Sequence, residues 1–285
     1  MSALSPASRE AGRFAPGKLL VIVILCGVAL LWSTPLLWMI VASAKDIPYG
    51  ADTAASLVPG PFTAGHFIDA WQQGSFPVWY LNTILMTGGI LIVQIFTITL
   101  AGYAFARMTF RGKNVLFYCF LLQMTLAPAV LIVPNTAMLA RIGLYDTLTG
   151  VMAPYFASAF GVFLMRQTFK MIPPDFEDAA TVDGANLWQT IWHVLLPLAR
   201  PGLIAFSIVS VTSHWNEFLW PLMVTDSPDN MVLTVGLTSF VRSAEQAADW
   251  GLVAASTLLV AGPLLIAFAL FQRQFVNSFL FSGVK

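Results

Sequence analysis

Six long runs of apolar residues constrain this chain more than any other feature of its sequence. A helix needs about 20 mostly apolar residues to cross a lipid bilayer. Runs of this kind occur at 19–44, 82–106, 115–134, 148–165, 202–224 and 250–271. Only 10% of the 285 residues are charged, whereas a soluble domain carries roughly 25%. The sequence therefore predicts an all-α polytopic membrane protein with six transmembrane helices.

The Lys and Arg residues divide unevenly between the two sides that six spans create. Eleven fall on one side: Arg9, Arg13, Lys18, Arg107, Arg111, Lys113, Arg166, Lys170, Arg200, Arg273 and Lys285. Three fall on the other: Lys45, Arg141 and Arg242. Because cytoplasmic segments carry an excess of these residues, the first side is predicted to be cytoplasmic, with both termini inside. Residues 1–18 are then a cytoplasmic N-terminus, and 19–285 form one membrane domain.

Composition and motifs also exclude several classes of function. The formal net charge is zero, which gives no basis for binding nucleic acid. His193 and His214 lack further ligands at metal-site spacing, so no metal site is predicted. There is no His-Glu-x-x-His constellation and no Gly-rich loop that ends in Lys-Ser/Thr. We therefore expect no catalytic residue and no ATP hydrolysis by this chain, which is predicted not to be an enzyme.

The most informative polar segment is the predicted cytoplasmic loop at 171–200, which is expected to form two short helices joined by an elbow. Pro173 and Pro174 interrupt the helix that precedes them. Asp175 is predicted to cap the first short helix, with acidic residues in its first turn. Gly184 is predicted to end this helix in a left-handed conformation.

The second short helix is predicted to begin at Asn186, with Gln189 completing a capping box, and to end at Pro197. Its apolar stripe consists of Leu187, Ile191, Leu195 and Leu198. This stripe is expected to pack against the ends of the chain's own spans. The first helix is expected to expose Ala179 and Ala180, which are small enough to enter a groove on a partner.

This loop resembles a signature of permease subunits in binding-protein-dependent ABC importers. The residues from Asp178 to Gly184 (DAATVDG) and the later Val-Leu-Leu-Pro that ends at Pro197 are similar to the family pattern Glu-Ala-Ala…Gly…Ile-x-Leu-Pro. Asp178 stands where the family has Glu, and Val194 stands where it has Ile. In that family the segment is the coupling helix, which docks in a cleft of the cytoplasmic ATPase. The resemblance implies ATPase-coupling roles within 175–197 for Glu177, Asp178, Ala179, Ala180, Asp183, Gly184 and Pro197.

The resemblance extends over nearly the whole chain. Asn82 with Thr83, 101–107 (AGYAFAR), 215–222 (WNEFLWPL) and the tail 272–276 (QRQFV) are similar to carbohydrate-importing permeases of the maltose-permease type. This resemblance implies the type I ABC importer permease fold in a bacterial inner membrane. The implied partners are membrane lipid, a second homologous permease, an extracytoplasmic substrate-binding protein, and two ABC ATPase subunits that bind ATP and Mg²⁺.

The resemblance also implies that this chain needs no cofactor and carries a carbohydrate or a related polyol or glycerol-phosphate solute. Glu245, together with Trp250 and the stretch 254–259, resembles the glycerol-phosphate branch. An ion-coupled secondary transporter is the alternative interpretation, since that class places ionisable residues near the membrane midplane.

Glu217 is the one acidic residue inside a predicted span. Burial of a carboxylate in lipid costs several kcal/mol, on the order of 2.5 or more. Two interpretations stay open: a role in the translocation pathway together with Trp215 and Asn216, or local pairing near the outer interface.

Two further segments carry open alternatives. Pro128, with Gln123 and Asn135 nearby, marks either an irregular, cavity-lining helix or a simple kink, and the simple kink is the favoured interpretation. The outer loop at 45–78 is either a docking surface for an extracytoplasmic partner or a mere connection.

Overall fold

A computed structural model describes residues 16–45, 62–247 and 249–283. Outside the described part lie most of the predicted N-terminal segment, the outer-loop residues 46–61, and the side chains of Lys18, Glu245, Lys285 and the tail motif at 273–276. Every regular element within the described residues is a helix. The predicted all-α class is confirmed.

Three helices are long and apolar enough to cross a membrane without a break. They are α1 (Pro16–Ala44), α4 (Phe76–Arg107) and α15 (Trp250–Gly283). α4 begins at Phe76 rather than at residue 82, with Pro77 in its first turn. Proline suits that position because the first N–H groups of a helix have no partner within it.

The third predicted span, 115–134, is a sharply broken helix and not the simple kink that was the favoured interpretation at Pro128. α5 (Lys113–Thr125) and the segment that contains α6 (Ile132–Arg141) meet at 102°. Pro128 lacks a backbone N–H and disfavours helical geometry at the residue before it. Ala127 accordingly lies in the extended region, with ψ of 128°.

The fourth and fifth predicted spans are interrupted as well. α7 (Leu148–Met152) and its 3₁₀ extension meet α8 (Ala159–Met171) at a bend of 44°. α12 (Arg200–Trp215) is separated from α13 (Leu219–Val224) by the non-helical residues 216–218, where one continuous span was predicted. Within the described residues, three unbroken helices and three bent helix pairs give up to six membrane spans, the third pair being Leu187–Leu198 with Arg200–Trp215. This agrees with the predicted number.

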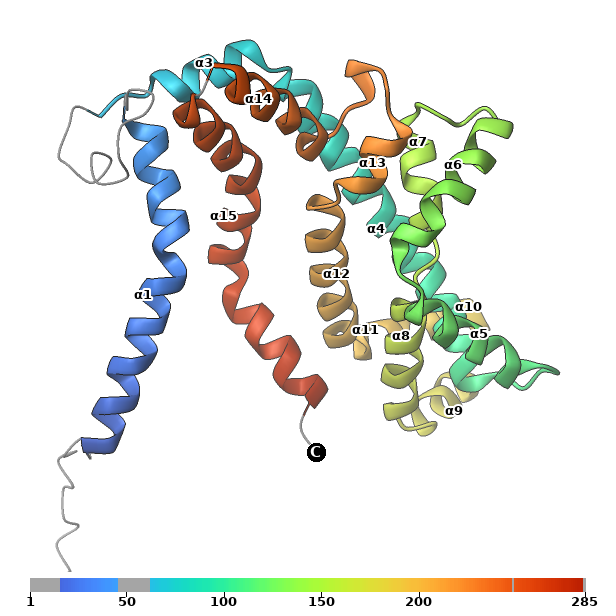
Figure 1. Cartoon of the computed structure of the whole chain (residues 1–285). Helices are drawn as coiled ribbons and strands as arrows, with labels where there is room; N and C mark the ends of the chain where they lie inside the picture. The colour runs from blue at the N-terminus through green and yellow to red at the C-terminus, as the bar shows by residue number, and fades with distance from the viewer. Residues whose placement is uncertain (1–15, 46–61, 248, 284–285) are drawn as a thin grey trace, which may run out of the picture.

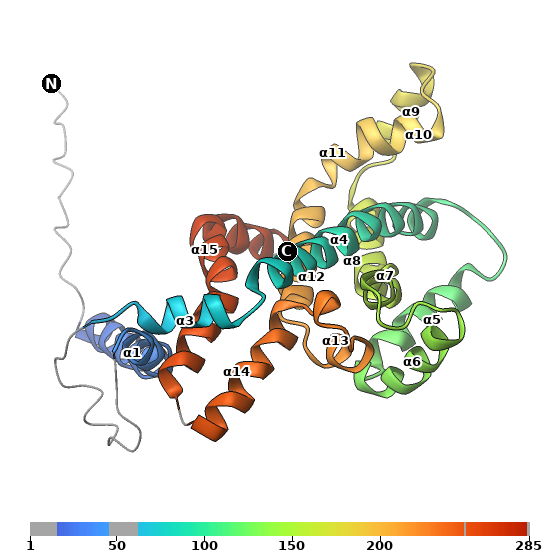
Figure 2. The same ribbon diagram turned by 90° about the horizontal axis from the view of Figure 1, so that it is seen from above.

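α4 is the central helix, and Figure 2 shows α8 and α12 alongside it. A core cluster around Ile98, Met165 and Phe206 joins the three helices. A Cβ atom on Gly161 of α8 would lie only 2.6 Å from Ile98 Cγ2. Small residues at such crossings let helix backbones approach closely in a membrane protein.

Two helices that the sequence analysis missed lie at the end of the molecule opposite α9 (Asp175–Val182) (Figure 1). They are α3 (Gly65–Gln73) and α14 (Leu233–Ala247). Both combine a polar face with an apolar one, so neither produces the long apolar run used to find spans. Aromatic side chains of these helices pack against α4. The ring of Phe240 on α14 stacks on the ring of Phe76 on α4, with centroids 5.8 Å apart.

Asp146 links its own loop to the loop at 226–230 by hydrogen bonds, at this same end of the molecule. Its carboxylate accepts hydrogen bonds from the backbone N–H of Asp226 at 2.9 Å, the backbone N–H of Ser227 at 3.0 Å, and the Ser227 hydroxyl. Asn230 donates to the Asp146 carbonyl at 2.6 Å. The Ser227 hydroxyl, followed by the backbone donors, lowers the pKa of the Asp146 carboxyl from 3.8 to about 2, because these bonds favour its charged form.

We expect Asp146→Asn to lower the midpoint of thermal unfolding in detergent by several degrees at pH 7. The contribution of Asp146 is fully present above its unfolded-state pKa of 3.8 and is lost as pH falls toward its folded-state pKa of about 2. The difference between wild type and variant should therefore stay constant above about pH 5 and narrow below about pH 4. Asp229→Asn is the control, because Asp229 contributes its main-chain carbonyl to the contact with Asn82. Equal midpoints for wild type and Asp146→Asn at pH 7 would contradict the assignment.

Candidate functional site

The loop at 171–200 forms the predicted pair of short helices, with one correction at its start. The first helix, α9, has Pro174 and not Asp175 at its N-cap position, and no side chain caps it. Pro174 has a φ of −57°, which is already helical, and its carbonyl accepts hydrogen bonds from the N–H groups of Glu177 and Asp178 at 2.8 and 3.1 Å. Asp175 instead lies in the first turn with Glu177 and Asp178, where negative charge is favourable.

The elbow between the two helices has the predicted geometry. Gly184 has a φ of +80°, a left-handed conformation that glycine adopts without steric cost. The N–H of Ala185 donates to the carbonyl of Ala180 at 2.9 Å, which closes the end of α9. The capping box between Asn186 and Gln189 is present in both directions, so these predictions are confirmed.

The second short helix runs past Pro197. It consists of α10 (Leu187–Gln189), a π-helical segment at Thr190–Leu195 and α11 (Leu196–Leu198), and it meets α12 at 78°. The expected end at Pro197 is therefore one residue early. The packing stripe is half correct: Ile191 and Leu195 are buried, whereas Leu187 and Leu198 are exposed.

One face of α9 is fastened to the rest of the chain. Arg107, in the last turn of α4, donates from Nε to Glu177 Oε1 at 2.5 Å and from Nη2 to the carbonyl of Ile172 at 2.6 Å. The Tyr103 hydroxyl donates to Glu177 Oε2 at 3.3 Å. Both partners of the ion pair are mostly buried, with side-chain exposures of 18% and 17%. This arrangement ties together the ends of α4 and α8 and the start of α9.

These contacts change two sequence-based assignments. Ala180 was expected to be exposed to a partner but is buried at 6% exposure, one turn along from Glu177. Glu177 was grouped with the residues that contact a partner, yet its carboxylate faces Arg107 and Tyr103. Both residues hold α9 in place within this chain.

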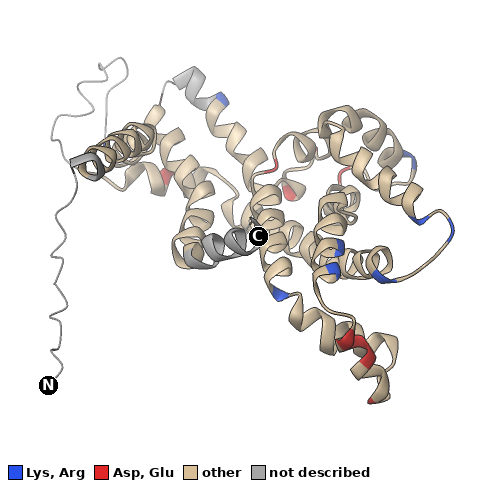
Figure 3. Cartoon of the chain, turned by 90° about the horizontal axis from the view of Figure 1, so that it is seen from below, with Lys and Arg blue, Asp and Glu red and all other residues tan. Residues whose placement is uncertain are grey.

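The opposite face of α9 is exposed and carries a stripe that the sequence analysis missed. Phe176 and Val182 are exposed at 46% and 88%, and Ala179 lies between them at helical spacing. The recurrence of apolar residues at i, i+3 and i+6 is the signal that would have revealed them. Asp175, Asp178 and Asp183 are also exposed, and Figure 3 shows acidic residues gathered on this projecting tip.

The other candidate site is a cavity of about 440 Å³. All three helix interruptions border it: Leu126 and Pro128 from the break in the third span, Ala157 and Ser158 from the fourth, and Glu217 from the fifth. Non-helical backbone at membrane depth is tolerated only where protein buries it or where it lines a water-filled space. The convergence of three breaks on one space therefore singles out this cavity.

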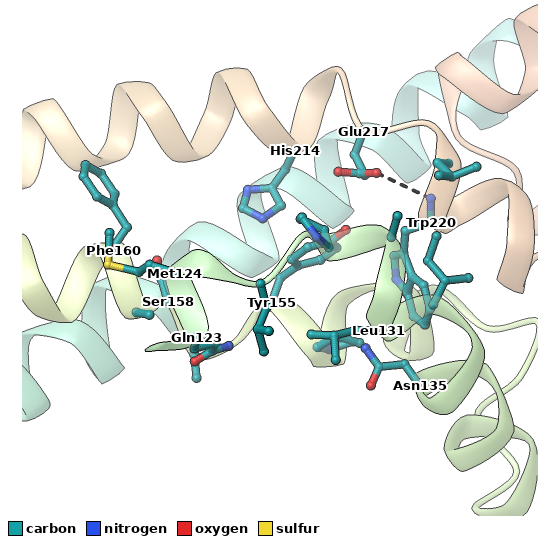
Figure 4. A pocket seen from close by; sticks show the side chains of 18 of the residues that line it. Gln123, Met124, Leu131, Asn135, Tyr155, Ser158, Phe160, His214, Glu217 and Trp220 are labelled. Carbon is teal, nitrogen blue, oxygen red and sulfur yellow. Dashed lines mark hydrogen bonds between the residues drawn. The ribbon is translucent and has the colours of Figure 1, made fainter. Parts of the chain in front are cut away.

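Polar side chains face this cavity from two sides (Figure 4). Glu217 and His214 lie on one wall, Gln123 and Asn135 on the facing wall, and Tyr155 between them. The Glu217 carboxylate accepts a hydrogen bond from the backbone N–H of Trp220 at 3.4 Å. His214 is buried and bonds to the carbonyl of Ser210 at 2.7 Å.

The three consecutive residues predicted to share a pathway role, 215–217, have side chains that contact different parts of the chain. Only Glu217 lines the cavity. Trp215 donates from Nε1 to the carbonyl of Val260 on α15 at 3.2 Å, and Asn216 bonds to the carbonyl of Thr212 in its own helix at 2.8 Å. Of the two interpretations of Pro128, the irregular, cavity-lining helix fits the structure and the favoured simple kink does not.

Comparisons with known proteins identify related sequences. The family described as "Binding-protein-dependent transport system inner membrane component" matches residues 95–278. The diacetylchitobiose uptake system permease protein NgcG of Streptomyces coelicolor is 30% identical over 87% of this chain and 84% of its own length. The sn-glycerol-3-phosphate transport system permease protein UgpE of Pectobacterium atrosepticum is 30% identical over 85% of this chain and 89% of its own length.

A solved structure shares the fold. A chain from a bacterial ABC transporter involved in the import of the acidic polysaccharide alginate superposes with a TM-score of 0.78 at 24% identity. The match covers 94% of the present chain and all of the other chain. The alternative of an ion-coupled secondary transporter finds no support in these comparisons.

We expect Glu177→Gln and Arg107→Gln to speed hydrogen–deuterium exchange in α9, because each leaves a mostly buried charge without its partner. Hydrogen bonds to charged groups contribute roughly 1.5–3 kcal/mol each, so exchange should rise at least tenfold, by about 1.4 kcal/mol of opening free energy. The measurement is mass spectrometry on the protein in lipid nanodiscs.

Asp175→Asn is the matched control, since it removes a charge from the exposed side of the same turn. The double exchange of Arg107→Glu with Glu177→Arg should restore part of the protection. Unchanged exchange in both single variants would show that the ion pair does not hold α9.

Proposed function

We propose, because this chain belongs to the family of binding-protein-dependent transport system inner membrane components, that it forms half of the translocation pathway of an ATP-driven importer and couples to separate ATPase subunits through α9. Members of this family are non-catalytic permease subunits of ABC transporters. The observation that carries the coupling role is the two-sided character of α9. One face is locked to α4 by Arg107, and the other presents an apolar stripe with acidic residues beside it.

The solute class follows from the relatives. One is named for diacetylchitobiose uptake and another for sn-glycerol-3-phosphate transport, so we assign this chain to importers of carbohydrates or of related polyol or glycerol-phosphate solutes. The partners would be a second homologous permease, two ABC ATPase subunits and an extracytoplasmic binding protein. ATP and Mg²⁺ would bind to the ATPases alone.

The charge distribution supports a cytoplasmic position for α9. Arg107, Lys113, Lys170 and Arg200 lie in the terminal turns of their helices at the α9 end of the molecule, and basic residues accumulate on the cytoplasmic side of membrane proteins. Docking on an ATPase would bring the exposed Asp175, Asp178 and Asp183 against that partner. Asp178, which is shorter than the family's Glu, is exposed and free of the contacts that hold Glu177.

The coupling mechanism follows from the geometry. ATP-driven closure of the two ATPases would move their docking clefts, and α9 with them. Because Arg107 joins α9 to α4 and because α11 leads directly into α12, the displacement would reach two central helices. Tilting these helices would open the pathway alternately to the two sides of the membrane.

We expect Ala179→Trp to prevent assembly with the ATPase subunits, because a large ring at the centre of the exposed stripe cannot enter a groove shaped for a methyl group. The measurement is co-purification of the tagged permease with its ATPases in detergent, followed by ATP-driven uptake in proteoliposomes.

Ala179→Ser is the matched control, since it keeps the small volume and should retain assembly and uptake. A thermal unfolding curve of the isolated permease checks that the Trp variant is folded. Normal assembly and uptake by a folded Ala179→Trp variant would overturn the assignment of α9 as the docking element.

A further inference from the structure

We propose that the cavity bordered by the three helix breaks is a solute-binding subsite of this subunit, and that it takes a neutral, hydroxyl-rich solute rather than a phosphorylated or otherwise anionic one. The proposal rests on the proposed function and narrows its solute class. It also places a binding site within this chain, which the proposed function leaves open.

The charge of the cavity lining disfavours an anionic solute. Glu217 is the one ionisable acid among the lining residues, and no Lys or Arg lines the cavity within the described part of the chain. A phosphate or carboxylate solute needs cationic or multiple N–H donors to replace its hydration. Here it would instead meet the Glu217 carboxylate, so an anionic solute is disfavoured.

Two amide side chains on the wall formed by α5 and α6 are free to hydrogen-bond a solute. The side chains of Gln123 and Asn135 face the cavity (Figure 4), and neither makes a side-chain hydrogen bond among the described contacts. Gln94, by contrast, is satisfied by the carbonyl of Tyr155 at 2.7 Å and the hydroxyl of Ser210 at 2.6 Å. Each open amide offers both donors and an acceptor, which is what a solute hydroxyl group needs.

The position of Gln123 along its span also favours a pathway. Gln123 is exposed near the end of α5, as the eleventh of its 13 residues, which corresponds to roughly 16 Å along the helix. An exposed amide within a membrane span is costly against lipid. This wall must therefore face water, solute or protein, which fits a pathway better than a lipid-facing surface.

The carboxylate is best explained as a hydroxyl acceptor. Glu217 already receives a hydrogen bond from the backbone N–H of Trp220, so part of its charge is compensated without a cationic solute. The rings of Tyr155, Trp220 and Phe160 add apolar lining. Apolar walls with a few placed polar groups, in a volume of about 440 Å³, are typical of small-solute sites.

The main test is uptake by the complete importer in proteoliposomes, assembled from this chain, its partner permease, the ATPases and the binding protein. The solutes are radiolabelled neutral mono- and disaccharides, sn-glycerol 3-phosphate and a uronic acid disaccharide. We expect uptake of a neutral solute only. With that solute, Asn135→Leu and Glu217→Gln should each lower kcat/KM for uptake roughly five- to tenfold, the size expected from one lost hydrogen bond.

Thr136→Val is the matched control for Asn135→Leu. Thr136 lies next to Asn135 on α6 but outside the cavity lining, and its hydroxyl bonds back to the carbonyl of Ile132 at 2.9 Å. It should leave uptake unchanged. Uptake of an anionic solute by the wild type, or unchanged kcat/KM in both cavity variants, would overturn the proposal. Failure of assembly, or no ATP-driven uptake of any solute, would instead refute the proposed function.

A second measurement tests the charge of the cavity without transport. Ala157 lines the cavity and is exposed, so Ala157→Cys, with Cys26 and Cys119 changed to Ser, places a single thiol there. A cationic methanethiosulfonate should react faster than an anionic one, relative to their rates with a free thiol. Glu217→Gln should reduce this preference. Equal relative rates, or faster reaction of the anionic reagent, would contradict the absence of cationic groups, and protection of the thiol by choline would indicate a cationic solute.

Discussion

The constraint on which this structure depends is that backbone N–H and C=O groups must find partners inside a membrane. Three of the predicted spans are interrupted, and polar side chains of neighbouring helices supply hydrogen-bond partners for the backbone at two of these breaks. Gln94 and Thr97 of α4 donate to the carbonyls of Tyr155 and Phe156 at the break between α7 and α8. Thr234 of α14 donates to the carbonyl of Glu217 at the break after α12. The cavity exists because these partners stabilise an irregular backbone there.

α4 provides such contacts along its whole length. Near its start, Asn82 donates to the carbonyls of Asp229 and Met231, and Thr83 accepts from the N–H of Leu233. In the middle of α4, Gln94 donates to the carbonyl of Tyr155 beside the cavity. At the end of α4, Arg107 binds Glu177 of α9. One unbroken helix therefore links the loops at one face, the cavity, and the tip that projects from the other face. These contacts account for Asn82, Thr83, Gln94, Thr97 and Arg107, whereas the hydroxyls of Thr87 and Thr99 are buried without a hydrogen-bond partner.

The sequence predicted the number of spans and the elbow at Gly184 because both depend on local chemistry: run length, glycine conformation and capping. It did not predict where spans break, since Pro128 alone does not distinguish a mild kink from a bend of 102°, and the break at 216–218 contains no proline. The roles of Glu177 and Ala180 were also beyond local patterns. Arg107, which holds Glu177, lies 70 residues away in the sequence, and only tertiary packing decides which face of α9 is covered.

The placement of the breaks bears on how α9 and the cavity are connected. α8 and α12 each run without interruption from the α9 end of the molecule to a break at the cavity, over 13 and 16 residues. A rigid helix transmits a displacement of one end to the other, whereas a non-helical link absorbs changes in backbone angle. A movement of α9 would therefore reach the cavity through these helices and be taken up at Ser158 and Glu217, which are also lining residues. Two of the polar residues that line the cavity, Ser158 and Glu217, thus lie at the joints between helices.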